Sequence, residues 1–134
     1  MLLILTAILW GAPPAIEKTA LKTTNALTGL AIRNIAITVV LLIIVTFQGN
    51  WSDIAGTPSR EKLLFGISGI CAGLLGMFTY YMALKITPVS KAVPITASYP
   101  LVAVILGALF LGENVGWQRV VGTVFIIAGV WLVR

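Results

Sequence analysis

Long apolar stretches alternate with short polar segments along the chain. Charged and turn-forming residues divide it into five apolar spans, each near the roughly 20 residues that a helix needs to cross about 30 Å of hydrocarbon. The predicted spans cover residues 2–21, 31–47, 63–84, 89–111 and 116–133. The longest predicted loop, residues 48–62, contains the turn formers glycine, asparagine and proline. The pattern predicts one domain over residues 1–134, an all-α integral membrane protein folded as a bundle of five transmembrane helices.

Composition supports a membrane protein and excludes several other classes. The 134 residues are 59% hydrophobic and 10% charged, whereas about 25% of an average globular protein is charged. With no histidine and one cysteine, the chain lacks the ligands of a His/Cys zinc cluster. It also cannot form a Ser/His or Cys/His catalytic pair, in which histidine activates the nucleophile. The nine basic residues are scattered singly, without the basic stripe of a nucleic-acid binder. We therefore expect no enzyme activity, no cofactor, no metal and no nucleic-acid partner.

The distribution of Lys and Arg predicts an orientation in the membrane. One side carries three basic residues, and the other, which includes the 18–33 loop, carries six. The residues on the second side are Lys18, Lys22, Arg33, Lys85, Lys91 and Arg134. We expect this side to be cytoplasmic in the inner membrane, with the N-terminus outside and the C-terminus inside. A difference of six to three also permits dual insertion.

Prolines interrupt two of the predicted spans. They are Pro13 and Pro14 in the first span, beside Gly11, and Pro94 and Pro100 in the fourth. Each proline lacks a backbone N–H, so the carbonyl four residues earlier loses its helical partner. In lipid, such carbonyls must be satisfied by protein, water or a ligand. Proline is also a common kink in membrane helices, but two interrupted spans in one short chain favour a polar cavity near the middle of the membrane.

Aromatic and hydroxyl side chains lie close to these breaks and predict substrate contacts. Trp10 adjoins the first break, and Thr96 and Tyr99 share one face of the fourth span if that helix is continuous. Tyr80 and Tyr81 lie near the end of the third span, where they fit an interfacial belt or a cavity equally well. An aromatic cage of this kind can hold an apolar or cationic metabolite through stacking and cation–π contacts.

Glycines recur at helical spacing in two spans. They are Gly66, Gly69, Gly73 and Gly76 in the third span and Gly122 and Gly129 in the fifth. Steps of three, four and seven residues place them on one face of an α-helix. Because small residues let helix backbones approach closely in lipid, these faces predict helix packing or a dimer seam.

Glu17 is the only acidic residue within a predicted span. It lies near the span end, and Lys18 and Lys22 are close in sequence. This arrangement predicts an interfacial charge pair with those lysines rather than an ion-coupling site.

Three segments of the chain resemble the EamA domain of the drug/metabolite transporter superfamily. They are LWG at Leu9–Gly11, ALKITPVSKAVPITASYPLVAVILGALFLGE at Ala83–Glu113, and GTVFIIAGVWLV at Gly122–Val133. Arg33, at the entrance to the second span, also fits the family. Members commonly carry two five-helix repeats in one chain, and this chain resembles one repeat of that ten-helix architecture, as in half-size members.

The resemblance implies a secondary transporter that exports or exchanges small metabolites, such as amino acids or related compounds, by alternating access. It implies a homodimer or a heteromer with a related half-transporter, and it assigns substrate contact to the five aromatic and hydroxyl positions above. Two alternatives remain: a subunit of a lipid-linked sugar flippase, and a membrane assembly subunit that does not transport. The first span lacks the central glutamate of the four-helix multidrug exporters, so proton antiport by that mechanism is not expected.

Overall fold

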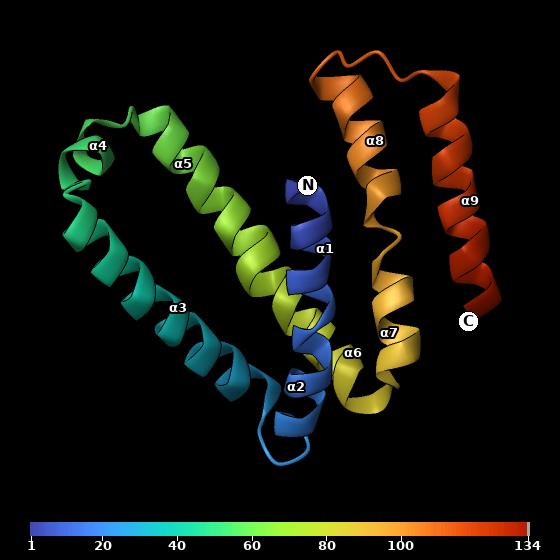
Figure 1. The fold of residues 1–134 in the computed structure, drawn as a ribbon, viewed down its shortest axis with the longest axis horizontal. Coiled ribbons are helices and arrows are strands. Elements are labelled where there is room, and N and C mark those ends of the chain that lie inside the picture. Colours follow the sequence, from blue (N-terminus) through green and yellow to red (C-terminus); the bar gives the residue numbers. More distant parts are fainter. Residues whose placement is uncertain (134) are drawn as a thin grey trace. The chain divides into compact units, whose positions relative to one another are not determined.

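The computed structural model describes residues 1–133, which form helices and no strands (Figure 1). The helices are α1 (Leu2–Gly11), α2 (Pro13–Ala20), α3 (Ala26–Gln48), α4 (Trp51–Gly56), α5 (Ser59–Ser68), the π-helix η1 (Gly69–Gly76), α6 (Met77–Ile86), α7 (Val89–Thr96), α8 (Tyr99–Phe110) and α9 (Trp117–Val133). The five predicted spans correspond to α1–α2, α3, α5–α6, α7–α8 and α9. The prediction of an all-α fold is confirmed.

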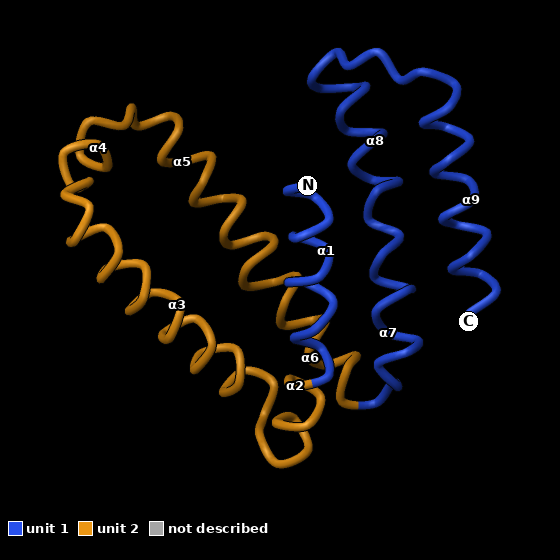
Figure 2. Tube along the Cα trace, viewed as in Figure 1, with its two compact units in different colours: residues 1–15, 86–134 blue, residues 16–85 orange. Residues whose placement is uncertain are grey.

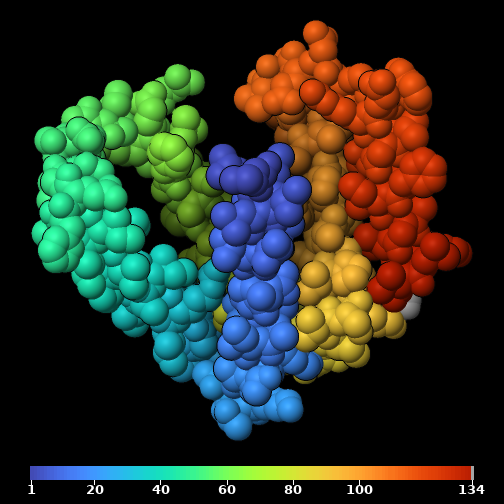
Figure 3. Space-filling model, in the orientation of Figure 1, coloured from blue at the N-terminus to red at the C-terminus, as the bar shows by residue number. Residues whose placement is uncertain are grey.

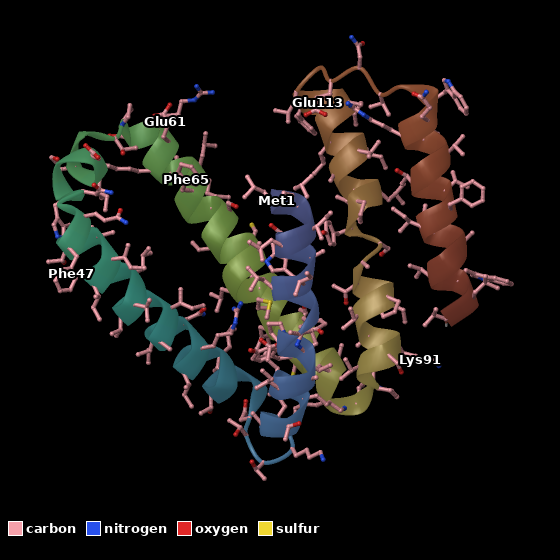
Figure 4. The ribbon with its side chains drawn as sticks, viewed as in Figure 1. Met1, Phe47, Glu61, Phe65, Lys91 and Glu113 are labelled. Atoms are coloured by element: carbon pink, nitrogen blue, oxygen red, sulfur yellow. The ribbon has the colours of Figure 1, made fainter. Side chains whose placement is uncertain are left out.

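Three helical stretches within the described chain, one of them broken between α7 and α8, are long and apolar enough to cross a membrane. They are Ala26–Gln48, Ser59–Ile86 and Val89–Phe110, and α9 is a shorter apolar helix of 17 residues. Large apolar side chains point outward from these helices, among them Phe47 and Phe65, which are 89% and 78% exposed (Figure 4). Such a surface is suited to lipid rather than to water.

The chain divides into two compact units (Figure 2). Unit 1 joins residues 1–15 to the chain from Ile86 onward, and unit 2 comprises residues 16–85. In unit 1, α7 and α8 lie against α9 (Figure 3). The turn after α8 is formed by the LGE sequence: Gly112 takes a φ of +63°, and the N–H of Glu113 donates to the carbonyl of Gly107 at 3.1 Å. Glycine at position 112 permits this left-handed turn, which ends the helix.

Unit 2 contains most of the fully buried apolar side chains of the described residues. They are Leu21, Ala26, Leu30, Tyr81 and Leu84, each no more than 3% exposed. These residues come from the end of α2, the start of α3 and the end of α6, so the core of unit 2 lies where these helix ends meet. The same end of the unit carries a pair of partly exposed opposite charges, Glu17 and Arg33.

Helix α3 begins five residues earlier than the predicted second span, at Ala26 rather than residue 31. The reason is Asn25, whose side chain accepts a hydrogen bond from the N–H of Leu27 at 2.9 Å and so caps the helix. Arg33, expected at the end of a loop, therefore lies in the second turn of α3. The predicted 48–62 loop likewise contains a short helix, α4.

The glycines of the third span do not lie in one uninterrupted α-helix, as the prediction of a shared face assumed. Between Gly69 and Gly76 the backbone forms a π-helix, which has more residues per turn than an α-helix. The shared face was derived for an uninterrupted α-helix, and the packing or dimer role of these glycines stays a prediction.

Candidate functional site

Both proline-containing spans are divided into two helices. In the first, α1 ends at Gly11 and α2 begins at Pro13. In the fourth, α7 ends at Thr96 and α8 begins at Tyr99. Pro100 lies in the first turn of α8, where a backbone N–H has no helical partner, so proline is well tolerated there. Pro94 itself lies inside α7, and the break falls one turn further along the chain.

Hydroxyl groups at the second break bond to nearby backbone carbonyls. Thr96 Oγ1 donates to the carbonyl of Ala92 at 2.7 Å, and Ser98 Oγ donates to the carbonyl of Ile95 at 2.8 Å. These bonds supply donors to a stretch of helix weakened by proline. Because the helix is interrupted, Thr96 and Tyr99 flank the break instead of sharing one face of a continuous helix.

The rings of Trp10 and Tyr99 meet within unit 1. Their centroids are 6.5 Å apart and the ring planes are inclined by 65°, an edge-to-face contact. Both side chains remain more than half exposed, at 65% for Trp10 and 55% for Tyr99. Trp10 is in the last turn of α1 and Tyr99 is in the first turn of α8, so this contact brings the two helix breaks side by side.

The other two predicted contact residues lie in unit 2. The rings of Tyr80 and Tyr81 are 6.4 Å apart. Tyr81 is buried, whereas Tyr80 is half-buried with a hydroxyl that has no hydrogen-bond partner among the described residues. The five predicted positions therefore form two groups: Trp10, Thr96 and Tyr99 in unit 1, and Tyr80 and Tyr81 in unit 2.

Glu17 connects Tyr81 to Arg33 within unit 2. The Tyr81 hydroxyl donates to Glu17 Oε1 at 2.8 Å, and Arg33 Nε lies 3.6 Å from the same oxygen. The side chain of Glu17 is 14% exposed and that of Arg33 is 38% exposed. Glu17 thus pairs with an arginine 16 positions along the chain, and the predicted pairing with Lys18 and Lys22 is wrong.

Lys18 instead bonds to the end of α6. Its Nζ donates to the carbonyl of Leu84 and, at 3.1 Å, to that of Lys85. Lys85 in turn donates to the carbonyl of Thr24 at 2.9 Å, in the turn between α2 and α3. Cations are favourable at helix C-termini, where carbonyls lack helical partners. The two lysines therefore hold the ends of α2 and α6 together.

A pocket of about 300 Å³ opens beside the Glu17–Arg33 pair. It is lined by Glu17, Thr24, Arg33 and Tyr81 together with the smaller or apolar Ile16, Ala20, Leu21, Gly29 and Ile32. All nine residues belong to unit 2. Sequence analysis did not identify this pocket, because Arg33 was assigned to a loop. The signal that could have located the pocket is the lone carboxylate inside a span, which needs an opposite charge that another helix can supply.

Comparison with known protein families assigns the chain. It matches the EamA-like transporter family over residues 1–134. The chain belongs to this family. The resemblance noted in the sequence is thereby confirmed, and the EamA chain is a multi-pass membrane transporter rather than an enzyme.

Relatives of this EamA chain include both short and long transporters. It is 32% identical over 101 residues to the "uncharacterized transporter in cobO 3'region" of Sinorhizobium sp, covering 75% of this chain and 71% of that protein. It is 33% identical over 87 residues to a probable 4-amino-4-deoxy-L-arabinose-phosphoundecaprenol flippase subunit, ArnF, of Photorhabdus laumondii, covering 63% of this chain and 69% of ArnF. It is 45% identical over 58 residues to the S-adenosylmethionine uptake transporter of Rickettsia bellii, covering 41% of this chain and 20% of that protein. No solved structure matches the EamA chain.

Proposed function

We propose that this EamA-family chain exports or exchanges small metabolites, such as amino acids or related compounds, by alternating access. The observation that carries the proposal is the pair of helix breaks joined by Trp10 and Tyr99. Secondary transporters place substrate where helices are interrupted near the middle of the membrane. The helix lengths support this: α1 has 10 residues before its break and α7 has 8, or about 15 Å and about 12 Å of helix, each near half of the hydrocarbon thickness.

The exposed rings give this position its binding chemistry. A half-exposed tryptophan and tyrosine offer apolar area, π-faces, an indole N–H and a phenol hydroxyl to a ligand. Cation–π contacts with such rings contribute about 0.5–2 kcal/mol, depending on desolvation. The pair therefore suits a small molecule with an apolar or cationic group. Thr96 serves mainly to complete the helix break, since its hydroxyl bonds to the backbone.

We include a dimer in the proposal, either a homodimer or a heteromer with a related half-transporter. Alternating access requires one bundle to move against another, and this chain supplies one five-helix repeat. Several glycines have open space where a Cβ would stand, with no atom within 4 Å among the described residues: Gly66, Gly69, Gly73, Gly122 and Gly129. Open glycine surfaces support close approach by helices of another chain.

Metabolite profiling tests the transport proposal. The medium of cells that overproduce this chain is compared with that of cells producing a Tyr99→Ala, Thr96→Val double variant at equal membrane levels. A Trp131→Ala variant, altered in an exposed ring at the end of α9, serves as the matched control. We expect a metabolite to accumulate with the unmodified and control chains and to fall with the double variant. If purified chain in liposomes also moves no metabolite of a broad panel, the proposal is wrong.

A flippase subunit is the second candidate, and the ArnF match favours it. The chain covers 69% of the Photorhabdus ArnF, which shows that the two are of similar size. This candidate predicts an obligate partner chain and movement of a lipid-linked sugar, with no metabolite accumulation from the chain alone. Co-purification of a second small membrane protein, together with lipid-linked sugar translocation by the pair, would decide for it.

We further propose that the N-terminus is outside and the six-charge side is cytoplasmic in the inner membrane. The proximity of Lys18, Arg33 and Lys85 in unit 2 supports the assignment of these residues to one side. Cysteine labelling tests it in a Cys71→Ala background. A Lys22→Cys variant is expected to resist a membrane-impermeant maleimide in intact cells, and an Arg60→Cys variant is expected to react.

A further inference from the structure

We infer that the pocket beside Glu17 and Arg33 binds a small zwitterion, with a free α-amino acid as its ligand. The inference rests on the proposed transport of small metabolites for its biological meaning. The binding test below does not depend on transport.

The first argument is the pairing of opposite charges within a span. Arg33 lies about 10 Å into α3 at helical rise, and Glu17 is 14% exposed. Ionisable side chains at such positions are costly and are commonly part of a substrate or ion pathway. The cost of desolvating Glu17 is offset by Tyr81 and Arg33 together. The three residues come from three helices, α2, α3 and α6.

The second argument is the unused bonding capacity on the pocket side. Among the described residues, the interactions of Glu17 all use Oε1, and the ion pair of Arg33 uses Nε. Glu17 Oε2 and the terminal guanidinium nitrogens of Arg33 remain available to a ligand. A guanidinium presents its donors in a fork that matches a carboxylate, and a carboxylate oxygen accepts from an ammonium.

The third argument favours a ligand that carries both charges. Arg33 Nε and Glu17 Oε1 are only 3.6 Å apart, so any charged ligand is close to both. An anion would be attracted by Arg33 but repelled by Glu17, and a cation would be attracted by Glu17 but repelled by Arg33. A neutral ligand can form hydrogen bonds with these groups but gains no attraction between opposite charges. A molecule with an ammonium and a carboxylate on one carbon satisfies both groups at once.

The pocket walls define the rest of the ligand. Ile16, Leu21 and Ile32 supply apolar surface, and Gly29 leaves room beside the Tyr81 ring, 3.6 Å from where a Cβ would stand. A volume of about 300 Å³ is at the lower limit of small-molecule sites. The pocket is therefore suited to an amino acid with a small or medium apolar side chain, and leucine is a suitable probe.

The test measures equilibrium binding of radiolabelled L-leucine to the full chain in nanodiscs of phosphatidylglycerol. The competitors are L-leucinamide, which keeps the ammonium but lacks the carboxylate, and N-acetyl-L-leucine, which keeps the carboxylate but lacks the ammonium. We expect each to bind about tenfold or more weakly than leucine, because each loses one charge-assisted contact. Equal affinity for the three compounds, or no binding of any amino acid, would overturn the inference.

Two variants assign the contacts. In Arg33→Gln the preference for leucine over leucinamide is expected to disappear, and in Glu17→Gln the preference over N-acetyl-leucine is expected to disappear. Each comparison is between ligands on one protein, so partial loss of folded protein does not change the ratio. If Arg33→Gln fails to fold, Arg33→Lys keeps the charge but loses the fork, and it is expected to weaken leucine binding. Preferences that remain unchanged in the variants contradict the site, and Lys22→Gln, outside the pocket, is the control.

A zwitterionic lipid headgroup has the same chemistry as a free amino acid. Nanodiscs that contain phosphatidylethanolamine distinguish the two sources: unchanged leucine affinity supports the free amino acid, whereas Arg33-dependent competition assigns the site to the headgroup and overturns the amino acid as its ligand. Failure of the proposed function is separate. Transport of another metabolite without leucine binding refutes only this site, and leucine binding without any transport refutes only the transport proposal.

Discussion

The hydrogen bond between Tyr81 and Glu17 is predicted to stabilise unit 2 measurably. Tyr81 is 3% exposed, and its hydroxyl donates to Glu17 Oε1 at 2.8 Å. A hydrogen bond to a charged group contributes about 1.5–3 kcal/mol. Tyr81→Phe keeps the ring and removes this bond, leaving Glu17 with Arg33 at 3.6 Å. We expect the free energy of unfolding in mixed micelles, measured by SDS titration, to fall by about 1.5–3 kcal/mol.

The neighbouring tyrosine provides the control for this prediction. The hydroxyl of Tyr80 is buried and has no hydrogen-bond partner among the described residues. Removing an unsatisfied hydroxyl costs no bond, so Tyr80→Phe is expected to be neutral or slightly stabilising. A double-mutant cycle between Tyr81→Phe and Glu17→Met isolates the pair, because Tyr81→Phe removes the donor and Glu17→Met removes the acceptor of this bond. Equal effects of the two Tyr→Phe changes, or an additive cycle, would refute the reasoning.

Three further predictions concern positions outside this pair. Trp10→Ala is expected to weaken the apparent affinity for transported metabolite by about three- to tenfold through loss of ring contacts, whereas Trp131→Ala leaves it unchanged in the same liposome assay. Gly112→Ala forces alanine to a φ of +63°, so we expect the free energy of unfolding in SDS titration to fall by about 1–2 kcal/mol. Gly56→Ala, at a position without a positive φ, is the control and is expected to leave it unchanged. Asn25→Ala removes the cap of α3 and is expected to cost about 1 kcal/mol, largely restored by Asn25→Ser.

The helix breaks were the part of the site that sequence chemistry could locate. Proline lacks an N–H wherever it occurs, so Pro13, Pro14 and Pro100 mark weak points whatever the tertiary structure. The meeting of Trp10 with Tyr99 could not be derived in the same way, because it depends on how helices distant in sequence pack. Residue types gave the candidates, and packing determined which of them lie together.

Errors in the sequence analysis arose where local rules were extended too far. The start of α3 was placed too late because the polar residues before it were taken as loop, although Asn25 is a good helix cap. Glu17 was paired with its nearest lysines because sequence distance was used in place of spatial distance. The prediction that Gly69, Gly73 and Gly76 share one face assumed a constant 3.6 residues per turn, which a π-helix does not have.

The small buried core has a consequence for the response of the protein to temperature. Among the described residues only seven apolar side chains are buried: Pro14, Leu21, Ala26, Leu30, Tyr81, Leu84 and Ala92. The heat capacity of unfolding grows with the apolar area that passes into water, and helices that separate within a bilayer keep most of their apolar side chains in lipid. The heat-capacity change of this transporter is therefore small. We expect its stability to decline almost linearly on heating, without the dome-shaped curve and the cold denaturation of water-soluble proteins.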